Sequence, residues 1–161
     1  MNDVRVGQGF DIHRFSDDPD RPLVLGGVVF EGARGLHGHS DADAVAHAVA
    51  DALLGAAALG DLGEHFPDTD PRWKNANSLE LLAHVGILVR AAGWTIGNVD
   101  CSVVCEAPKL APRRAEMQAK LSEACGAQVT VKGRRAEGLG ALGRHEGIAC
   151  WAVAEIMKES D

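Results

Sequence analysis

Two segments carry metal-ligating residue types at spacings that let them act together. Asp11 and His13 lie two positions apart after an alternating apolar run, and such residues of an extended segment point to one face. The polar stretch 38–43 is followed by His47 on a predicted helix, and a carboxylate with two imidazoles leaves one tetrahedral position open, as in catalytic zinc sites. Asp51, one turn further on, is placed to orient the imidazole of His47. Taken alone, a D-x-H pair is a weak signal, and a histidine in an alanine-rich helix is more often a core residue bonded to a backbone carbonyl.

Three further segments are candidates for binding an anionic ligand. Residues 66–70 are turn-rich and have the composition of a solvated loop. Lys109 follows Pro108 after an apolar run, and it either presents a cation to a phosphate or begins a helix. Between 132 and 147, glycines alternate with arginines and would let backbone N–H groups approach a phosphate. This last stretch matches neither the P-loop nor the dinucleotide fingerprint, so by itself it predicts only a surface loop.

The elements that must position these residues follow from periodicity and capping. Four segments have the pattern of strands: 4–10, 94–105, 128–132 and 147–157. Residues 11–13 lie at the end of the first segment, and the last segment also has the alanine content of a helix. Segments with the pattern of helices are 40–59, 77–92 and 112–125. Ser40 is expected to cap the first helix and Gly60 to end it. The glycine pair within 22–30 indicates a hairpin or a bulged strand. This order predicts an α/β (α+β) two-layer sandwich, a small mixed sheet with helices packed on one face, in a single domain, 1–161.

Composition limits the classes of partner. The chain has 161 residues, 46% hydrophobic and 24% charged, which suits one domain that buries its core without a disulfide or a structural metal. A net charge of -7 argues against a nucleic-acid partner. No apolar run approaches the roughly 18 residues of a membrane span, so no membrane association is expected. The four cysteines form no CxxC pair and no leader is evident, which predicts a cytoplasmic protein with reduced thiols.

Taken together, the motifs resemble one family, the 2-C-methyl-D-erythritol 2,4-cyclodiphosphate synthases of the non-mevalonate isoprenoid pathway. The resemblance rests on 7–13, 39–43 with His47, 51–57, 59–63, 66–70, 97–100, 108–110, 143–144 and 146–149, in order over nearly the whole chain. It implies a homotrimer of α/β subunits with active sites between neighbours. The implied enzyme is a lyase that converts 4-diphosphocytidyl-2-C-methyl-D-erythritol 2-phosphate to the 2,4-cyclodiphosphate, with release of CMP and without consuming water.

The same resemblance implies the ligands of two metal ions and the residues that touch substrate. Zinc is expected at Asp11, His13 and His47, and magnesium or manganese is expected with the substrate phosphates at Glu137. His39 and Arg135 are expected to be catalytic. The expected substrate contacts are Asp11, His13, His39, Ser40, Asp61, Gly63, Phe66, Asp68, Asp70, Cys105, Ala107, Pro108, Lys109, Leu110, Arg134, Arg135, Glu137 and Arg144. Among these, 105–111 matches the cytidine-binding stretch, 66–70 a mobile loop over the erythritol, and Arg144 an arginine on the trimer axis, where relatives hold an isoprenoid diphosphate.

Two positions depart from the family pattern. Arg135 stands where a threonine hydroxyl usually meets the phosphates, and its guanidinium either stabilises the same charge or pairs with a surface carboxylate. Ala141 replaces a usually aromatic residue near the axis. The alternative to the enzyme is therefore a non-catalytic trimeric relative that binds isoprenoid diphosphate or metal. A generic metal phosphohydrolase would need a water-activating base, and the sequence offers none beyond His39.

Overall fold

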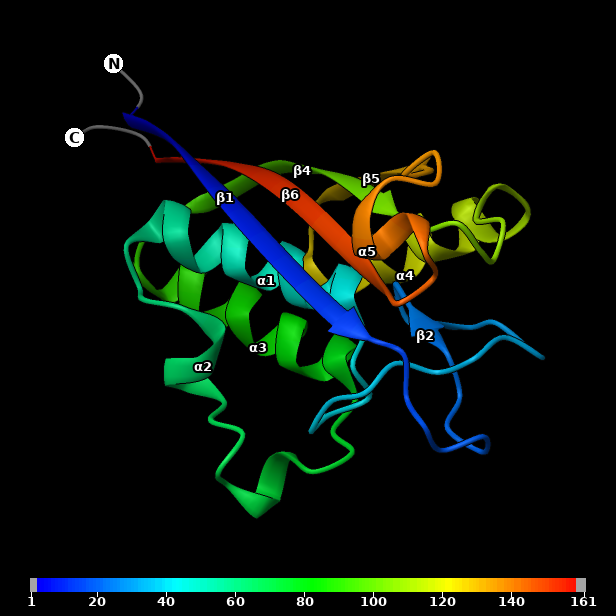
Figure 1. Cartoon of the computed structure of the whole chain (residues 1–161). Helices are drawn as coiled ribbons and strands as arrows, with labels where there is room; N and C mark the ends of the chain where they lie inside the picture. The colour runs from blue at the N-terminus through cyan, green and yellow to red at the C-terminus, as the bar shows by residue number, and fades with distance from the viewer. Residues whose placement is uncertain (1–2, 159–161) are drawn as a thin grey trace.

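The computed structural model describes residues 3–158 as a mixed sheet with its helices on one side (Figure 1). The sheet strands are β1 (Asp3–Arg14), β4 (Thr95–Val104), β5 (Gln128–Arg134) and β6 (Gly147–Lys158). The longer helices are α1 (Ala44–Ala57), α3 (Ser78–Ala91) and α4 (Arg114–Cys125). Shorter elements are β2 (Val24–Leu25), β3 (Val28–Val29), α2 (Leu62–His65), α5 (Gly140–Gly143) and the 3-10 turns Pro71–Trp73 and Ala111–Arg113.

The strand order across the sheet is β1-β6-β4-β5. β6 runs antiparallel to both of its neighbours, whereas β5 runs parallel to β4 and is reached through α4, because parallel strands need a crossover. β6 runs the length of β1, so Asp3 pairs with Lys158 and both ends of the described chain lie at the same end of the sheet. The predicted small mixed sheet with helices on one face is confirmed, and residues 147–157 form a strand.

Glycines let β1 lie directly against helix α1. A Cβ atom at Gly9 would stand 2.0 Å from the carbonyl oxygen of Ala48, and one at Gly7 would stand 2.0 Å from that of Ala52. Because alternate residues of a strand share a face, Asp11 and the other odd-numbered residues of β1 point to the same helix. The two metal-ligating side chains of β1 therefore face α1 for the same geometric reason that the glycines do.

The start of α1 differs from the expectation. Asp43, not Ser40, is the N-cap: its side chain accepts hydrogen bonds from the N–H groups of Val45 and Ala46. The helix then ends at Ala57, with Ala58 rather than Gly60 in the left-handed conformation at its C-cap. A carboxylate is as good a cap as a hydroxyl, and Asp43 comes directly before the first helical residue. Ser40 is thereby left free to lie beside the site.

Other local expectations hold or are extended. Gly26 and Gly27 both have positive φ, which joins β2 to β3 in the predicted hairpin. Asn77 caps α3 and Gly126 ends α4, as their residue types indicate. Pro112 lies in a 3-10 turn just before α4 rather than inside its first turn. Within residues 3–158, no helix is both long and apolar enough for a membrane crossing.

The sheet face away from the helices carries large apolar side chains. They belong to the even-numbered residues of β1 and the odd-numbered residues of β6 and are at least two-fifths exposed: Val4, Val6, Phe10, Ile12, Trp151 and Val153. The rings of Phe10 and Trp151 pack on each other, with centroids 4.8 Å apart. A contiguous apolar surface of this kind is a feature of interaction sites rather than of an ordinary solvated sheet face.

Candidate active site

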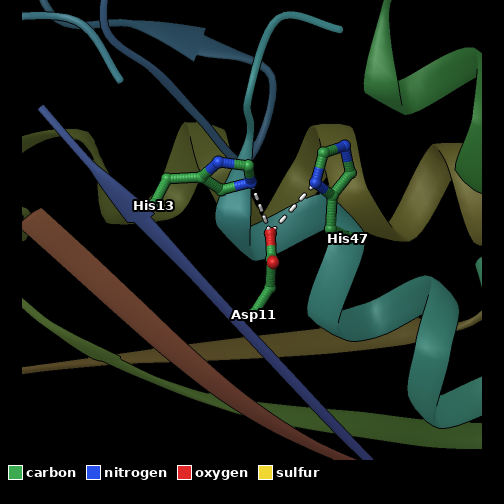
Figure 2. Close-up of side chains that lie close together, drawn as sticks. All are labelled: Asp11, His13 and His47. Atoms are coloured by element: carbon green, nitrogen blue, oxygen red, sulfur yellow. Dashed lines mark hydrogen bonds and ion pairs between the residues drawn. The ribbon is translucent and has the colours of Figure 1, made fainter. Parts of the chain in front are cut away.

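Asp11, His13 and His47 converge beside the sheet (Figure 2). The first two project from β1, and His47 projects from the beginning of α1 to meet them. Asp11 Oδ2 lies 2.9 Å from His13 Nε2 and 3.0 Å from His47 Nδ1. One ligand atom from each residue lies within 4.8 Å of the other two, so the group could hold a metal ion. The sequence spacing therefore correctly placed Asp11 and His13 on one face of β1, and the fold brings His47 of α1 to that face.

The hydrogen bonding of His13 favours a cation at this point. Its Nδ1 lies 2.8 Å from the carbonyl oxygen of His37, and because a carbonyl only accepts, Nδ1 carries a proton. Its Nε2, which then carries a lone pair, is buried and faces Asp11 Oδ2 at 2.9 Å. The nearest polar atom, Asp11 Oδ2, is an acceptor. A carboxylate and imidazole lone pairs that face one another form a donor set that suits zinc or another divalent transition metal.

The titration of the two β1 residues reflects this closeness. Burial raises the pKa of Asp11, but the hydrogen bonds and charges of His13 and His47 outweigh it and hold that pKa well below its usual range. Burial lowers the pKa of His13, but Asp11 and the His37 carbonyl raise that pKa by more than burial lowers it, so the net shift is upward. Because a metal ion binds an ionised carboxylate and imidazole lone pairs, metal binding at this group would compete with protons.

Asp51 does not orient His47, contrary to the expectation. Its carboxylate accepts a hydrogen bond of 2.9 Å from the N–H of Leu62 instead. The far nitrogen of His47, Nε2, lies 2.8 Å from the hydroxyl of Ser78 and 3.2 Å from that of Ser40. Ser78 follows His47 by 31 residues, so no spacing rule connects the two in the sequence.

A cavity of about 600 Å³ opens onto the two imidazoles. Of the residues expected to touch substrate, it is lined by His13, His39, Ser40, Phe66 and Asp68. His39 Nε2 lies 3.0 Å from the carbonyl oxygen of Asp70, whose carboxylate binds Arg72. Phe66 stands edge-on to Trp73, with ring centroids 5.1 Å apart. The turn-rich segment 66–70 thus forms a wall of the cavity rather than a free surface loop.

A second pocket, of about 340 Å³, lies at the ends of β4 and β5. It joins the segment after β4 to the end of β5 and includes the expected substrate residues Cys105, Pro108, Lys109, Leu110, Arg134 and Arg135. The peptide bond between Ala107 and Pro108 is cis. Because β4 and β5 are parallel neighbours, their carboxyl ends meet at one edge, which is where ligands commonly bind in α/β sheets.

Arg135 is paired with a carboxylate in this pocket. Its Nε and Nη2 donate to Glu106 Oε2 at 3.2 and 3.1 Å. The Glu106 side chain is 5% exposed, and its Oε1 has no hydrogen-bond partner among the described residues. Burial raises the pKa of Glu106, but Arg135 and the N–H groups of Ala136 and Gly138 lower it below the usual range. The structure thus pairs Arg135 with a carboxylate, but with a buried one rather than one on the surface. Glu106 is a pocket residue that the sequence did not single out.

The remaining expected residues lie apart from these two pockets in the single chain. Asp61 and Gly63 line a small hollow with Asp11 and His47, behind the metal-ligating group. Glu137 is exposed, has positive φ, and lies in the turn after β5, in no metal-ligating group among the described residues. Arg144 is exposed and pairs with Glu146 at 2.6 Å. One chain therefore carries the expected residues in separate places.

A mixed α/β sheet that holds a carboxylate and two imidazoles beside a cavity defines a protein with a candidate metal-dependent active site. The chain belongs to the YgbB family, whose model matches residues 4–157. The resemblance to the 2-C-methyl-D-erythritol 2,4-cyclodiphosphate synthases is confirmed, because curated synthases match this chain along its whole length.

Individual relatives make this membership concrete. A 2-C-methyl-D-erythritol 2,4-cyclodiphosphate synthase from Synechococcus elongatus is 51% identical over 162 residues, which cover 99% of this chain and 100% of that protein. A bifunctional enzyme IspD/IspF from Anaeromyxobacter dehalogenans is 54% identical over 158 residues. That match covers 96% of this chain, which spans only 40% of the bifunctional relative's length. Among solved structures, a CDP complex of IspF from Plasmodium falciparum matches with a TM-score of 0.84 and 32% identity, covering 99% of each chain.

Proposed function

We propose that this chain is a 2-C-methyl-D-erythritol 2,4-cyclodiphosphate synthase. The substrate is 4-diphosphocytidyl-2-C-methyl-D-erythritol 2-phosphate, and the products are the cyclic diphosphate and CMP. Identity to full-length synthases supports the reaction. The observation that carries it is the meeting of Asp11, His13 and His47 beside a cavity, with a buried His13 Nε2 that faces the Asp11 carboxylate.

In the proposed reaction an oxygen of the 2-phosphate forms a bond to the β-phosphorus. The bond from that phosphorus to the oxygen bridging it to the α-phosphate breaks, and CMP leaves with that oxygen. Because both reacting groups belong to one molecule, the chain acts mainly by holding them close together and in line. A divalent ion held by Asp11, His13 and His47 would offset the phosphate charge when bound. We assign Glu137 to the second ion, with the substrate phosphates.

The two pockets divide the substrate between them. We assign the erythritol and its phosphate to the cavity that His39, Ser40 and Phe66 line. We assign the cytidine to the pocket at 105–111, where Lys109 and Arg134 would meet its phosphates. Asp61 and Gly63 are assigned to the ribose. The bound CDP in the Plasmodium falciparum relative supports a nucleotide diphosphate as the ligand class.

We further propose a homotrimer in which neighbouring copies complete each site. The separation of the expected residues in one chain supports it, as does the apolar outer face of β1 and β6. Val6 is 67% exposed there, and Ile87 on α3 is 58% exposed and serves as a control away from that face. Sedimentation of the wild type should give a trimer; Val6→Asp should give a smaller species without CMP release, and Ile87→Asp should stay trimeric. A wild-type monomer that turns over substrate would exclude composite sites.

The test of the reaction is CMP release from the diphosphocytidyl substrate, with zinc and magnesium present. His13→Ala should lose both bound zinc and CMP release. His145→Asn is the matched control, because His145 is exposed and its positive φ suits asparagine. Zinc binding without CMP release by the wild type would identify the chain as the non-catalytic relative instead. A cytoplasmic location, the lyase class and the single-domain boundary 1–161 stay predictions.

A further inference from the structure

The far side of His47 carries a hydrogen-bond chain that the sequence does not reveal. His47 Nε2 lies 2.8 Å from Ser78 Oγ, and Ser78, the first residue of α3, is 1% exposed. The same serine contacts Asp41 through both of its donors: its N–H donates to Oδ2 at 3.0 Å and its hydroxyl donates to Oδ1. Two segments distant in sequence, 41–47 and the start of α3, therefore meet at one buried hydroxyl.

The direction of each hydrogen bond follows from the chemistry of the end group. An ionised carboxylate only accepts, so the Ser78 hydroxyl proton is directed to Asp41. The oxygen of that hydroxyl is left with lone pairs only, and it therefore accepts from His47 Nε2–H. A neutral imidazole carries one proton, so Nδ1, which faces Asp11 at 3.0 Å, presents its lone pair.

We propose that Asp41 and Ser78 are positioning residues that fix the tautomer and the orientation of His47, so that Nδ1 is the metal-binding atom. The two imidazoles of the site are then held by different means. The His37 backbone carbonyl holds His13, whereas side chains hold His47. Asp41 is itself held by its own N–H, which donates to the Ala76 carbonyl at 3.1 Å. The hydrogen-bond chain from His47 through Ser78 to Asp41 thus ends on the backbone just before α3.

The proposal extends the metal assignment made above, and its tests read metal binding and proton position rather than turnover. Outer hydrogen-bond partners of a ligating histidine typically contribute about 10–100-fold to metal affinity. Ser78→Ala removes the nearer acceptor of Nε2–H, at 2.8 Å, and leaves only the Ser40 hydroxyl, at 3.2 Å. Asp41→Asn keeps the size of the side chain but gives it only one carbonyl oxygen for the two donors of Ser78. Each variant should weaken zinc binding about 10–100-fold, measured by competition with a chelator.

Asp51→Asn is the matched control for the affinity measurement. Asp51 lies one helical turn from His47, and asparagine retains an oxygen for the Leu62 N–H that the carboxylate accepts. Its zinc affinity should stay within about twofold of the wild type. Urea unfolding of each metal-free variant separates a loss of affinity from a loss of fold.

Nitrogen NMR of the wild-type ring decides the proposal even if a variant does not fold. In the zinc-loaded protein, His47 should carry its proton on Nε2 and show a metal-shifted Nδ1. A proton on Nδ1, or wild-type zinc affinity in both folded variants, would overturn the proposal. Failure of the proposed reaction looks different: wild-type protein would then bind zinc through Nδ1 of His47 without releasing CMP.

Discussion

The close contact of β1 with α1 predicts that Gly9→Ala is destabilising out of proportion to its size. The added Cβ would stand 2.0 Å from the Ala48 carbonyl oxygen and 2.6 Å from the Ala52 nitrogen, whereas ordinary contact begins at 3.4 Å. Strand and helix must therefore separate by about 1.4 Å, because both contacting atoms are backbone and no rotamer relieves them. Overpacking of this kind costs about 1–3 kcal/mol, and the entropy that alanine removes from the unfolded chain returns about 0.4–1 kcal/mol. Because the added atom meets backbone on both sides, we take the upper end of that cost, about 3 kcal/mol, and after the return of about 1 kcal/mol we expect a net loss of about 2 kcal/mol in the free energy of unfolding.

Gly55→Ala is the matched control within the same pair of elements. Gly55 is an exposed position inside α1, and the nearest atom outside the helix to a Cβ there would be the Gln8 carbonyl oxygen, at 3.9 Å. This substitution should stabilise the helix by about 0.5–1 kcal/mol. Urea unfolding at equal subunit concentration measures both, and zinc titration should show weaker binding for Gly9→Ala alone, since Asp11 follows two residues later. Equal stability of the two variants, within about 0.5 kcal/mol, would refute the reasoning.

Two further predictions concern buried polar groups. Asp43 accepts from the N–H groups of Gly26 and Gly27 as well as capping α1, so Asp43→Ala should lower the free energy of unfolding by about 3 kcal/mol or more. Asn77→Ala, at the exposed cap of α3, should lower it by about 1 kcal/mol. Urea unfolding measures both losses, and equal losses would contradict the double role of Asp43. Burial, and secondarily the Glu106 charge, raises the pKa of the Cys105 thiol from 9.0 to about 11. Iodoacetamide at pH 8, followed by peptide mapping, should therefore modify Cys105 roughly 100-fold more slowly than an ordinary thiol, and a rate near that of free cysteine would show the pocket to be open.

Local patterns predicted what depends on neighbours in the chain. The D-x-H spacing placed Asp11 and His13 on one face because a strand alternates. The glycine pair predicted a hairpin or a bulged strand, and the structure has the hairpin, with positive φ at both glycines. The predicted N-cap of α1, Ser40, was wrong by three residues, because Ser40 and Asp43 are both good caps and only the folded chain selects between them.

The partners of His47 could not be predicted from spacing. Asp51 was chosen because it lies one turn away along the same helix, and proximity in sequence is the only guide that a single chain offers. Ser78 reaches the imidazole through the packing of α3 against α1, a contact across 31 residues. Glu106 was not singled out for the same reason, because its partner Arg135 directly follows the neighbouring parallel strand β5.

The Glu106–Arg135 pair bears directly on the departure from the family pattern. A guanidinium has five N–H donors, and Glu106 takes two of them, one from Nε and one from Nη2. Three donors remain on a side chain that is 65% exposed at the pocket edge. The buried carboxylate of Glu106 therefore fixes the orientation of the Arg135 guanidinium and leaves N–H groups of that guanidinium free to donate to a ligand. In the proposed reaction this leaves Arg135 able to supply the donor that a threonine hydroxyl supplies in relatives, held in place by a residue of the segment that we assign to the nucleotide.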